Sequence, residues 1–208
     1  MILIGQYDSP FVRRVGIAMT LYRMAFEHRP WSTFADAERL RPFNPLTRVP
    51  TLVLDDGTAL TESFAILDFL DGRVGDEEAL LPRREPERHR ALRIASLACG
   101  IADKAVSLFY ERRLHEHASD VWVARCRGQI TATLGLLERE RTGRDGEFWG
   151  GPRIGHADIA IACAWRFVRE AHPGLVADDT FPRLAHDAEK LERRPEFRRI
   201  AQTFVPPA

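Results

Sequence analysis

The stretch that decides the fold is 49–71, which reads VPTLVLDDGTALTESFAILDFLD. It opens with a β-branched run, and Asp55-Asp56-Gly57 is a turn signal of the kind that joins the strands of a hairpin. Residues 58–60 form a second short β-like run. From 62 to 71 the apolar residues recur at helical spacing on one side. The stretch therefore predicts a hairpin followed by a helix.

The residues before this stretch predict a strand–helix–strand unit. Residues 2–7, ILIGQY, favour a strand, and the apolar residues within 11–22 then follow the spacing of one helix face. A second strand is expected within 26–31, and a short helix within 33–40, closed by Pro42. The complete order, β-α-β-α-β-β-α, is that of a thioredoxin-like fold.

Beyond about residue 75 the chain changes character, because no convincing strand follows and the apolar residues keep helical spacing. We expect an α/β thioredoxin-like domain at 1–76, a linker over about 73–86 and an all-α helical domain at 84–208. One long helix is expected to begin at about residues 83–86, and two more are expected over 119–141 and 156–170. Two shorter helices, separated by Pro195, are expected to follow.

The composition is typical of a folded protein. Of 208 residues, 45% are hydrophobic and 29% are charged, so the chain has enough apolar surface for a core and disorder throughout is excluded. The 30 Lys and Arg balance the 30 Asp and Glu, which disfavours a generally basic nucleic-acid binder. We expect no nucleic-acid partner.

Signals for secretion or membrane insertion are missing from the sequence. The first residues lack a basic region followed by a long apolar one, and no uncharged run approaches the ~20 residues that cross a bilayer. The three cysteines, Cys99, Cys126 and Cys163, are odd in number and too far apart for a CxxC motif, which fits a reducing compartment. We therefore expect a cytoplasmic protein without membrane association. The histidines have no metal-ligand spacing, so we expect no metal.

The turn Ser9-Pro10-Phe11-Val12 joins the first predicted strand to the first helix. Thiol–disulfide members of the thioredoxin-like fold carry C-P-x-C at this turn, so the sequence excludes dithiol chemistry here. A serine hydroxyl at a helix N-terminus can instead donate to a bound thiolate, which the helix dipole also stabilises. The competing structural interpretation is that Ser9 only caps the helix. Tyr7 is the alternative thiolate donor, although strand alternation would put it on the face shared with Gly5.

Two further motifs predict places for an extended zwitterionic peptide. If the Val49–Pro50 bond is cis, the Val49 backbone groups turn outward and can pair with such a peptide, and Arg48 can hold a carboxylate. Thr61 is expected to cap the next helix, which leaves N–H groups from Ser63 onward for a carboxylate, while Glu62 can accept from an ammonium group. Each motif alone also fits a plain strand start or helix cap.

The stretch Gly155-His156-Ala157-Asp158 opens the most apolar predicted helix. Asp158 falls at the third helical position, from which its carboxylate can accept from the backbone of the cap residue. It shares a face with apolar residues, so we expect it to be buried. We interpret Gly155 and Asp158 as structural residues that start the helix, not as catalytic residues.

These motifs, in this order and at these separations, resemble the cytosolic glutathione S-transferase superfamily over essentially the whole chain. The resemblance implies a thioredoxin-like domain, an all-helical domain and, usually, a homodimer. It implies glutathione as co-substrate, with Ser9 in the catalytic position, Arg48-Val49-Pro50 as the basic-Val-cis-Pro segment and Glu62-Ser63 as the pair that binds the γ-glutamyl group. The capping box would begin at Gly155 in place of the family's usual Ser or Thr.

The same resemblance implies contacts in the helical domain. Asp103 of a partner subunit would contact the γ-glutamyl amine. A second, apolar electrophilic substrate would lie between the domains near Phe11, Phe109, Tyr110 and Arg113. Ala102-Asp103, Tyr110-Glu111-Arg112-Arg113 and Val205-Pro206-Pro207 are similar to a bacterial branch, the YibF-like transferases, which implies a bacterial source and a detoxification role.

The reaction expected from this resemblance is conjugation of the glutathione thiolate to an electrophilic carbon. Two alternatives stay open. A glutathione-dependent isomerase or dehalogenase is one, because Arg14-Val15-Gly16-Ile17-Ala18 partly matches the zeta-type isomerases, although their double Ser and Cys are missing from the turn. The other is a non-catalytic binding protein on the same fold, against which the retained peptide-binding motifs argue.

Overall fold

The computed structural model describes residues 1–177, 179–204 and 206. Contacts divide the chain into two compact units: unit 1 comprises Met1–Leu80 with Arg194–Ala208, and unit 2 comprises Leu81–Arg193. Unit 1 thus includes the chain from Arg194 onward, which the predicted boundaries of 1–76 and 84–208 assign to the helical domain. Val205 and Pro207 of the predicted C-terminal motif lie outside the described residues.

Unit 1 is built on a four-stranded mixed sheet in the order β2-β1-β3-β4. The central strand β1 (Ile2–Ile4) is parallel to β2 (Glu27–Arg29) and antiparallel to β3 (Thr51–Val53), which is antiparallel to β4 (Ala59–Thr61). The turn Asp55-Asp56-Gly57 joins β3 to β4, with Gly57 at φ +87°, a conformation that favours glycine. The predicted hairpin is therefore confirmed.

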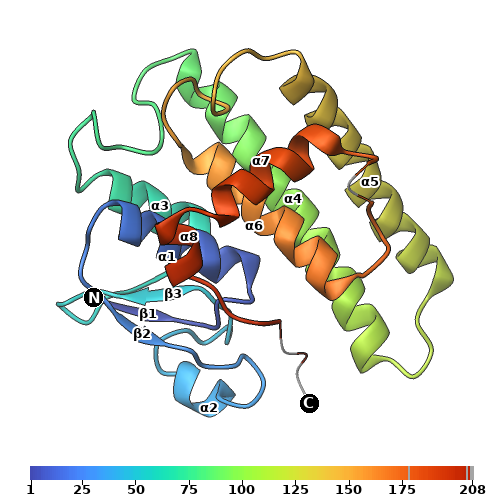
Figure 1. The fold of residues 1–208 in the computed structure, drawn as a ribbon. Helices are drawn as coiled ribbons and strands as arrows, with labels where there is room; N and C mark the ends of the chain where they lie inside the picture. The colour runs from blue at the N-terminus through green and yellow to red at the C-terminus, as the bar shows by residue number, and fades with distance from the viewer. Residues whose placement is uncertain (178, 205, 207–208) are drawn as a thin grey trace. The chain divides into compact units, whose positions relative to one another are not determined.

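Helices cover both faces of this sheet (Figure 1). Helices α1 (Pro10–Leu21) and α3 (Ser63–Asp71) pack together on one face, and the short α2 (Ala37–Leu40) lies on the other. Helix α8 (Pro195–Arg199) packs on α1. The apolar residues of β1, β3, α1 and α3 form the core, with Leu3, Leu52, Val15, Met19 and Leu70 fully buried.

The predicted helix over 33–40 forms only in its second half. Ser32 donates its backbone N–H to Asp36 Oδ2 (2.9 Å), and its Oγ accepts from the backbone N–H groups of Phe34 (3.2 Å) and Ala35 (3.3 Å). These side-chain bonds offer the backbone a turn in place of a helical repeat. Helix α2 consequently begins after Asp36.

Unit 2 consists of helices: α4 (Glu87–Leu114), α5 (Asp120–Thr142), α6 (His156–Ala171) and α7 (Pro182–Glu192). Helix α4 packs against α5 and α6, and α7 packs against α6 and α5. Helix α6 is the most buried, because apolar residues surround most of its circumference. The predicted pairing of a thioredoxin-like α/β domain with an all-helical domain is confirmed.

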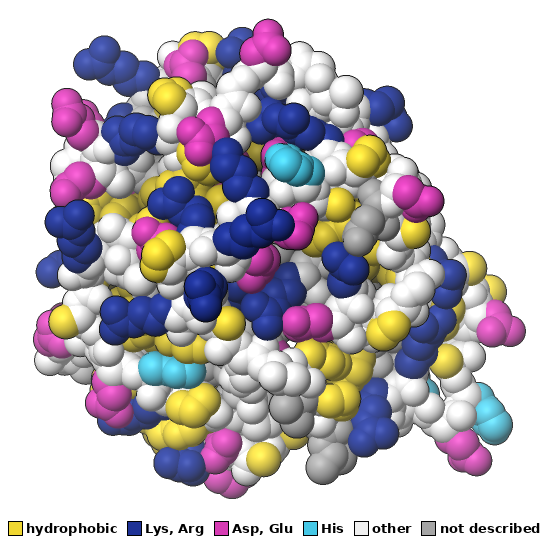
Figure 2. Space-filling model, in the orientation of Figure 1, with side chains coloured by type: hydrophobic (Ala, Val, Ile, Leu, Met, Phe, Trp, Pro, Cys, Tyr) yellow, Lys and Arg dark blue, Asp and Glu magenta, His cyan; other side chains and the backbone are white. Residues whose placement is uncertain are grey.

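The helices and the charged side chains on one face bear on membrane and nucleic-acid association. Within the described ranges, no helix is both long and apolar enough to cross a membrane. On the face shown in Figure 2, Lys and Arg side chains are interspersed with Asp and Glu, and the formal net charge of the chain is zero. Cys126 and Cys163 are buried, whereas Cys99 is half-buried.

Candidate functional site

Strand pairing brings three of the predicted segments to one edge of the sheet in unit 1. Ile4, at the end of β1, pairs with Thr51 at the start of β3, and Thr51 also pairs with Thr61 at the end of β4. The turn after β1, the Val49–Pro50 segment before β3 and Glu62 after β4 therefore share this edge. Residues that lie more than 50 positions apart in the chain become neighbours through register alone.

Gly5 shows how closely two of these segments approach. Its φ is +128°, and a Cβ built there would lie 2.5 Å from Val12 Cγ2 and 2.8 Å from Val49 Cβ. No side chain fits at those distances, so the position requires glycine on both steric and backbone grounds. The turn that leads to Ser9 consequently lies directly against Val49.

Ser9 is the N-cap of α1 and is half-buried. Its Oγ accepts from the Val12 backbone N–H at 3.4 Å, which leaves its own O–H available as a donor. Pro10 occupies the first helical position, where its missing N–H is no loss. The hydroxyl therefore stands at the positive end of a 12-residue helix, where an anion is favoured.

Tyr7 lies outside any strand, because β1 ends at Ile4, so the predicted strand over 2–7 is too long and its alternation argument does not apply. The Tyr7 ring instead stacks on His28, with the centroids 3.8 Å apart and the planes at 6°. Burial raises the pKa of the Tyr7 phenol to about 12, and the positive charge of Arg199 only partly opposes this rise. The Tyr7 phenol is thus kept in its neutral form, and its ring packs on His28.

The Val49–Pro50 peptide bond is cis. Asn44, which is buried, shapes the approach to it: its Nδ2 donates to the Arg48 carbonyl (2.9 Å) and to Thr51 Oγ1 (3.2 Å), and its Oδ1 accepts from the Leu46 N–H (3.1 Å). No hydrogen bond joins the Val49 backbone to another residue that the structure describes. Those groups remain available to an extended ligand.

Glu62, and not the predicted Thr61, stands at the N-cap of α3. Glu62 has φ +70°, which is unusual for a residue with a side chain, and it makes no side-chain cap hydrogen bond. The first N–H groups of α3, from Ser63 onward, therefore receive no partner from the cap residue. Arg48 Nη2 lies 3.9 Å from Glu62 Oε1, with both side chains largely exposed, so a cation and an anion flank this helix end.

Ser63 is buried, and Arg14 from α1 lies behind it. Arg14 is also buried and donates from Nη1 to Ser63 Oγ over 3.4 Å, while its guanidinium lies 4.5 Å from the centroid of the Phe64 ring. Neither Arg14 nor Asn44 was assigned a role from the sequence. The available signal for Arg14 was that Phe11, three residues before it, and Ala18, four residues after it, lie on the predicted apolar face of this helix.

Comparison with known proteins identifies this arrangement. Residues 3–78 match the family model "Glutathione S-transferase, N-terminal domain", and residues 120–198 match "Glutathione S-transferase, C-terminal domain". A curated relative from Escherichia coli K12, "Uncharacterized GST-like protein YibF", is 32% identical over 202 residues, covering 96% of this chain and 97% of that protein. The chain belongs to the glutathione S-transferase family. The predicted family is confirmed, and the family is one of transferase enzymes.

Solved members of the glutathione S-transferase family share the fold over its whole length. One from Methylobacterium radiotolerans, in complex with glutathione sulfonate, has a TM-score of 0.89 at 31% identity and covers 100% of this chain and 98% of its own. One from Pseudomonas fluorescens Pf-5, with bound glutathione, has a TM-score of 0.81 at 31% identity and covers 99% and 98%. The bound glutathione sulfonate and the bound glutathione belong to those two proteins.

The other predicted contact residues lie on different units. Phe11 is on α1, whereas Asp103, Phe109, Tyr110 and Arg113 are on α4. The rings of Phe109 and Tyr110 meet edge to face at 5.7 Å. Asp103 is exposed and pairs with Lys104 at 3.1 Å. Their roles toward an electrophile or a partner subunit stay predictions.

Asp158 lies at the third position of α6 and is 4% exposed. Its Oδ2 accepts from the Gly155 N–H (2.9 Å) and its Oδ1 from the Trp149 N–H (2.9 Å), so one carboxylate holds both the helix start and the loop before it. Burial raises the pKa of Asp158 to about 6, although the Trp149 and Gly155 N–H groups act in the opposite direction. Gly155 has no side chain, so only the Asp158 half of the capping box exists.

Within the described residues, no group of three His, Cys, Asp or Glu could hold a metal ion.

Proposed function

We propose that this glutathione S-transferase family member binds glutathione along the sheet edge of unit 1 and conjugates its thiolate to an electrophilic, apolar small molecule. One observation carries the proposal: Ser9 at the α1 N-terminus, the unpaired Val49 backbone and the uncapped N-terminus of α3 at Ser63 share one edge. Bound glutathione sulfonate in the relative from M. radiotolerans and bound glutathione in the relative from P. fluorescens support it.

Each part of glutathione has a chemically matched group at this edge. The γ-glutamyl carboxylate would accept from Ser63 and from the first N–H groups of α3, with the Arg14 charge behind them. Glu62 would accept from the γ-glutamyl ammonium, and the exposed Arg48, whose Nη2 lies 3.9 Å from Glu62 Oε1, would donate to a carboxylate. The backbone of the peptide would pair with Val49.

Ser9 supplies the chemistry in this proposal. Its O–H would donate to the glutathione sulfur, and the α1 dipole would add positive potential, so the thiol would lose its proton to solvent more readily than its usual pKa near ~8.5 allows. The thiolate then forms a carbon–sulfur bond with the electrophile, and the leaving group departs with the electron pair of the broken bond. Tyr7 is the weaker candidate, because its phenol is packed on His28.

The proposal extends to assembly and location. We propose a cytoplasmic homodimer in which Asp103 of the partner subunit contacts the γ-glutamyl amine. Phe11, Phe109, Tyr110 and Arg113 are proposed to contact the electrophile. Glutathione is the only co-substrate proposed.

Retention on immobilised glutathione, followed by a panel of electrophiles, tests the proposed function. The panel contains an aryl halide, an alkyl halide, an unsaturated carbonyl compound and a cis-dienone acid. We expect retention and turnover of one or more conjugation substrates. Halide release from the alkyl halide without accumulation of a glutathione conjugate would indicate a dehalogenase, and isomerisation of the dienone alone would indicate an isomerase. Retention without turnover would indicate a non-catalytic binding protein, and no retention would overturn the proposal.

A further inference from the structure

The chain after α8 is clamped to α1 by a buried arginine. Arg13 is 2% exposed, and it donates from Nε to the Ile200 carbonyl (2.8 Å) and from Nη2 to the Phe197 carbonyl (3.2 Å). Its guanidinium also lies 5.8 Å from the centroid of the Phe197 ring. Gly16, one turn further along α1, lets Ile200 approach so closely that a Cβ at Gly16 would lie 2.8 Å from Ile200 Cγ2. The end of α8 is therefore held in one place on α1.

From this anchor, Gln202 reaches the turn that carries Ser9. Gln202 Oε1 accepts from the Tyr7 backbone N–H at 3.1 Å, across 195 positions of sequence. Tyr7 precedes Ser9 by two residues, and the Ser9 N–H in turn donates to the Gln6 carbonyl at 3.2 Å. The bond from Gln202 thus acts on the middle of the turn between β1 and α1.

The remaining restraints on this turn come from β2. The Gly5 N–H donates to the Arg29 carbonyl (2.9 Å), and His28 Nε2 lies 2.8 Å from the Gly5 carbonyl, to which it donates in the neutral ring tautomer that carries the proton on Nε2. These contacts hold the start of the turn, and Gln202 holds its far side. Together they fix where Ser9 Oγ stands.

We infer that Gln202 is a positioning residue for Ser9, and that residues 200–202, directly after α8, are therefore part of the thiol site. This inference rests on the proposed function. A donor at a reacting atom has to be held within about 0.5 Å, and displacement by about 1 Å can cost a large part of its effect. Gln202 touches neither substrate nor sulfur in this scheme and acts only through the Tyr7 backbone.

Gln202 is a better test position than its neighbours because it is uncharged. His28 and Arg199 both face Tyr7, and the Arg199 charge acts on the Tyr7 phenol. Replacing either of them would change the electrostatic potential at the turn as well as its position. Gln202→Met keeps similar volume, removes the amide oxygen and leaves the Arg199 charge and the neutral His28 ring in place.

The first arm of the experiment measures the contact itself, without glutathione. In Gln202→Met we expect hydrogen exchange at the Tyr7 amide to accelerate about five- to tenfold, and in Gln202→Glu, which keeps an acceptor oxygen, to stay within about twofold of wild type. Thr203→Ala, at the next and exposed position, is the control and should exchange like wild type. Equal exchange in wild type and Gln202→Met would overturn the contact.

The second arm measures the thiol site. In Gln202→Met we expect kcat at about pH 6 to fall three- to tenfold, KM for glutathione to stay within about twofold, and the thiolate absorbance of bound glutathione to titrate at higher pH. A merely structural residue would not shift that titration. If Ser9→Ala shifts the titration and Gln202→Met does not, the inference is wrong and the proposed function stands. If wild type does not bind glutathione, the proposed function fails, while the first arm still decides the contact.

Discussion

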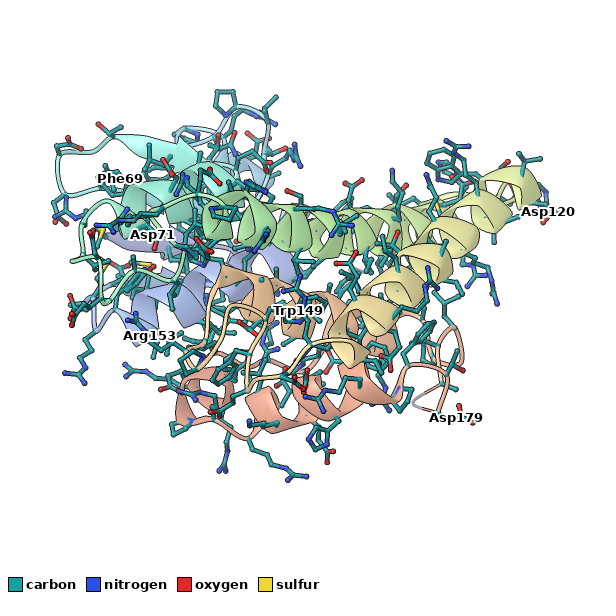
Figure 3. The ribbon with its side chains drawn as sticks, turned by 90° about the horizontal axis from the view of Figure 1, so that it is seen from above. Phe69, Asp71, Asp120, Trp149, Arg153 and Asp179 are labelled. Carbon is teal, nitrogen blue, oxygen red and sulfur yellow. The ribbon has the colours of Figure 1, made fainter. Side chains whose placement is uncertain are left out.

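The N-termini of α1 and α6 present the same chemistry in opposite states. At α6, a carboxylate from the chain's own Asp158 fills the helix end, buried and hydrogen-bonded to the N–H groups of Gly155 and Trp149 in the loop shown in Figure 3. At α1, a half-buried Ser9 makes one cap bond, to Val12, and keeps a donor for something outside the chain. One helix end is closed by the fold, and the other is left open.

The difference teaches how to separate a folding signal from a binding site at helix ends. An end filled by a buried group of the same chain contributes to stability, because its N–H groups would otherwise be buried without partners. An end that retains unused donors at the surface is available to an external anion. Helix α3, whose cap residue Glu62 makes no side-chain bond, belongs with α1.

Removing the Asp158 carboxylate from the N-terminus of α6 should cause the largest effect, a loss of stability. Asp158→Ala leaves the buried Trp149 N–H and the half-buried Gly155 N–H without their acceptor, so we expect the free energy of unfolding to fall by about 2–4 kcal/mol in denaturant titrations. The folded fraction should keep near-normal turnover. Asp120→Ala, which removes an exposed first-turn carboxylate of α5 (Figure 3), should change stability by less than about 0.5 kcal/mol. A folded Asp158→Ala protein that melts like wild type but is inactive would make Asp158 a site residue instead.

The pH dependence of the closed end should be nearly as large. Since burial raises the pKa of Asp158 from its usual 3.8 to about 6, the folded state binds more protons than the unfolded state between these values. The part of the stability that is linked to protonation of Asp158 is therefore full below about pH 4 and is lost as pH rises through about 6, a change of about 3 kcal/mol. The unfolding free energy of wild type minus that of Asp158→Asn should fall by this amount between pH 4 and 7. A flat difference would show that Asp158 titrates normally.

At the open end, Ser9→Ala should lower kcat with a model aryl halide by about 10- to 100-fold, because the thiolate loses its donor. The dissociation constant of glutathione should change by less than about threefold, since other groups hold the peptide. Tyr7→Phe is the matched control and should retain most activity, because its hydroxyl is not the proposed donor. The reverse result, with activity kept in Ser9→Ala and lost in Tyr7→Phe, would assign the role to Tyr7.

The third helix end can be tested by affinity. Ser63→Ala removes one donor to a charged carboxylate, so calorimetry should show glutathione binding about 10-fold weaker or more. Thr61→Ala, two residues earlier in β4, should leave the affinity within about twofold. Equal affinity in wild type and Ser63→Ala would remove the γ-glutamyl site from α3.

The smallest effect should come from improving the closed end. Gly155 has φ −139° and ψ 178°, an extended conformation that serine adopts readily. Gly155→Ser would supply the missing half of the capping box and raise the free energy of unfolding by a few tenths of a kcal/mol. Turnover should not change. A destabilised Gly155→Ser protein would show that the loop before α6 has no room for the hydroxyl.

Local patterns sufficed for most elements and for part of the site. The hairpin turn at Asp55-Asp56-Gly57 and the start of α6 depend on residues within a few positions of one another, so the sequence predicts them. Predictions of element bounds were wrong where the backbone turns at a positive φ. The strand predicted over 2–7 ends at Ile4, before Gly5 with φ +128°, and Glu62, with φ +70°, takes the cap position predicted for Thr61.

By itself, then, the sequence determined the order of the elements, the family and the motifs that carry the chemistry, because each is written in short-range spacing. Only the tertiary structure decided which residues stand behind those motifs. Arg14 behind Ser63 and Gln202 on the Tyr7 backbone are joined across 49 and 195 positions. Such contacts depend on strand register and on how α3 and α8 pack on α1, and no local periodicity encodes them. Burial also changes the pKa of a group, since a surface carboxylate and the buried Asp158 have the same chemistry and differ only in their surroundings.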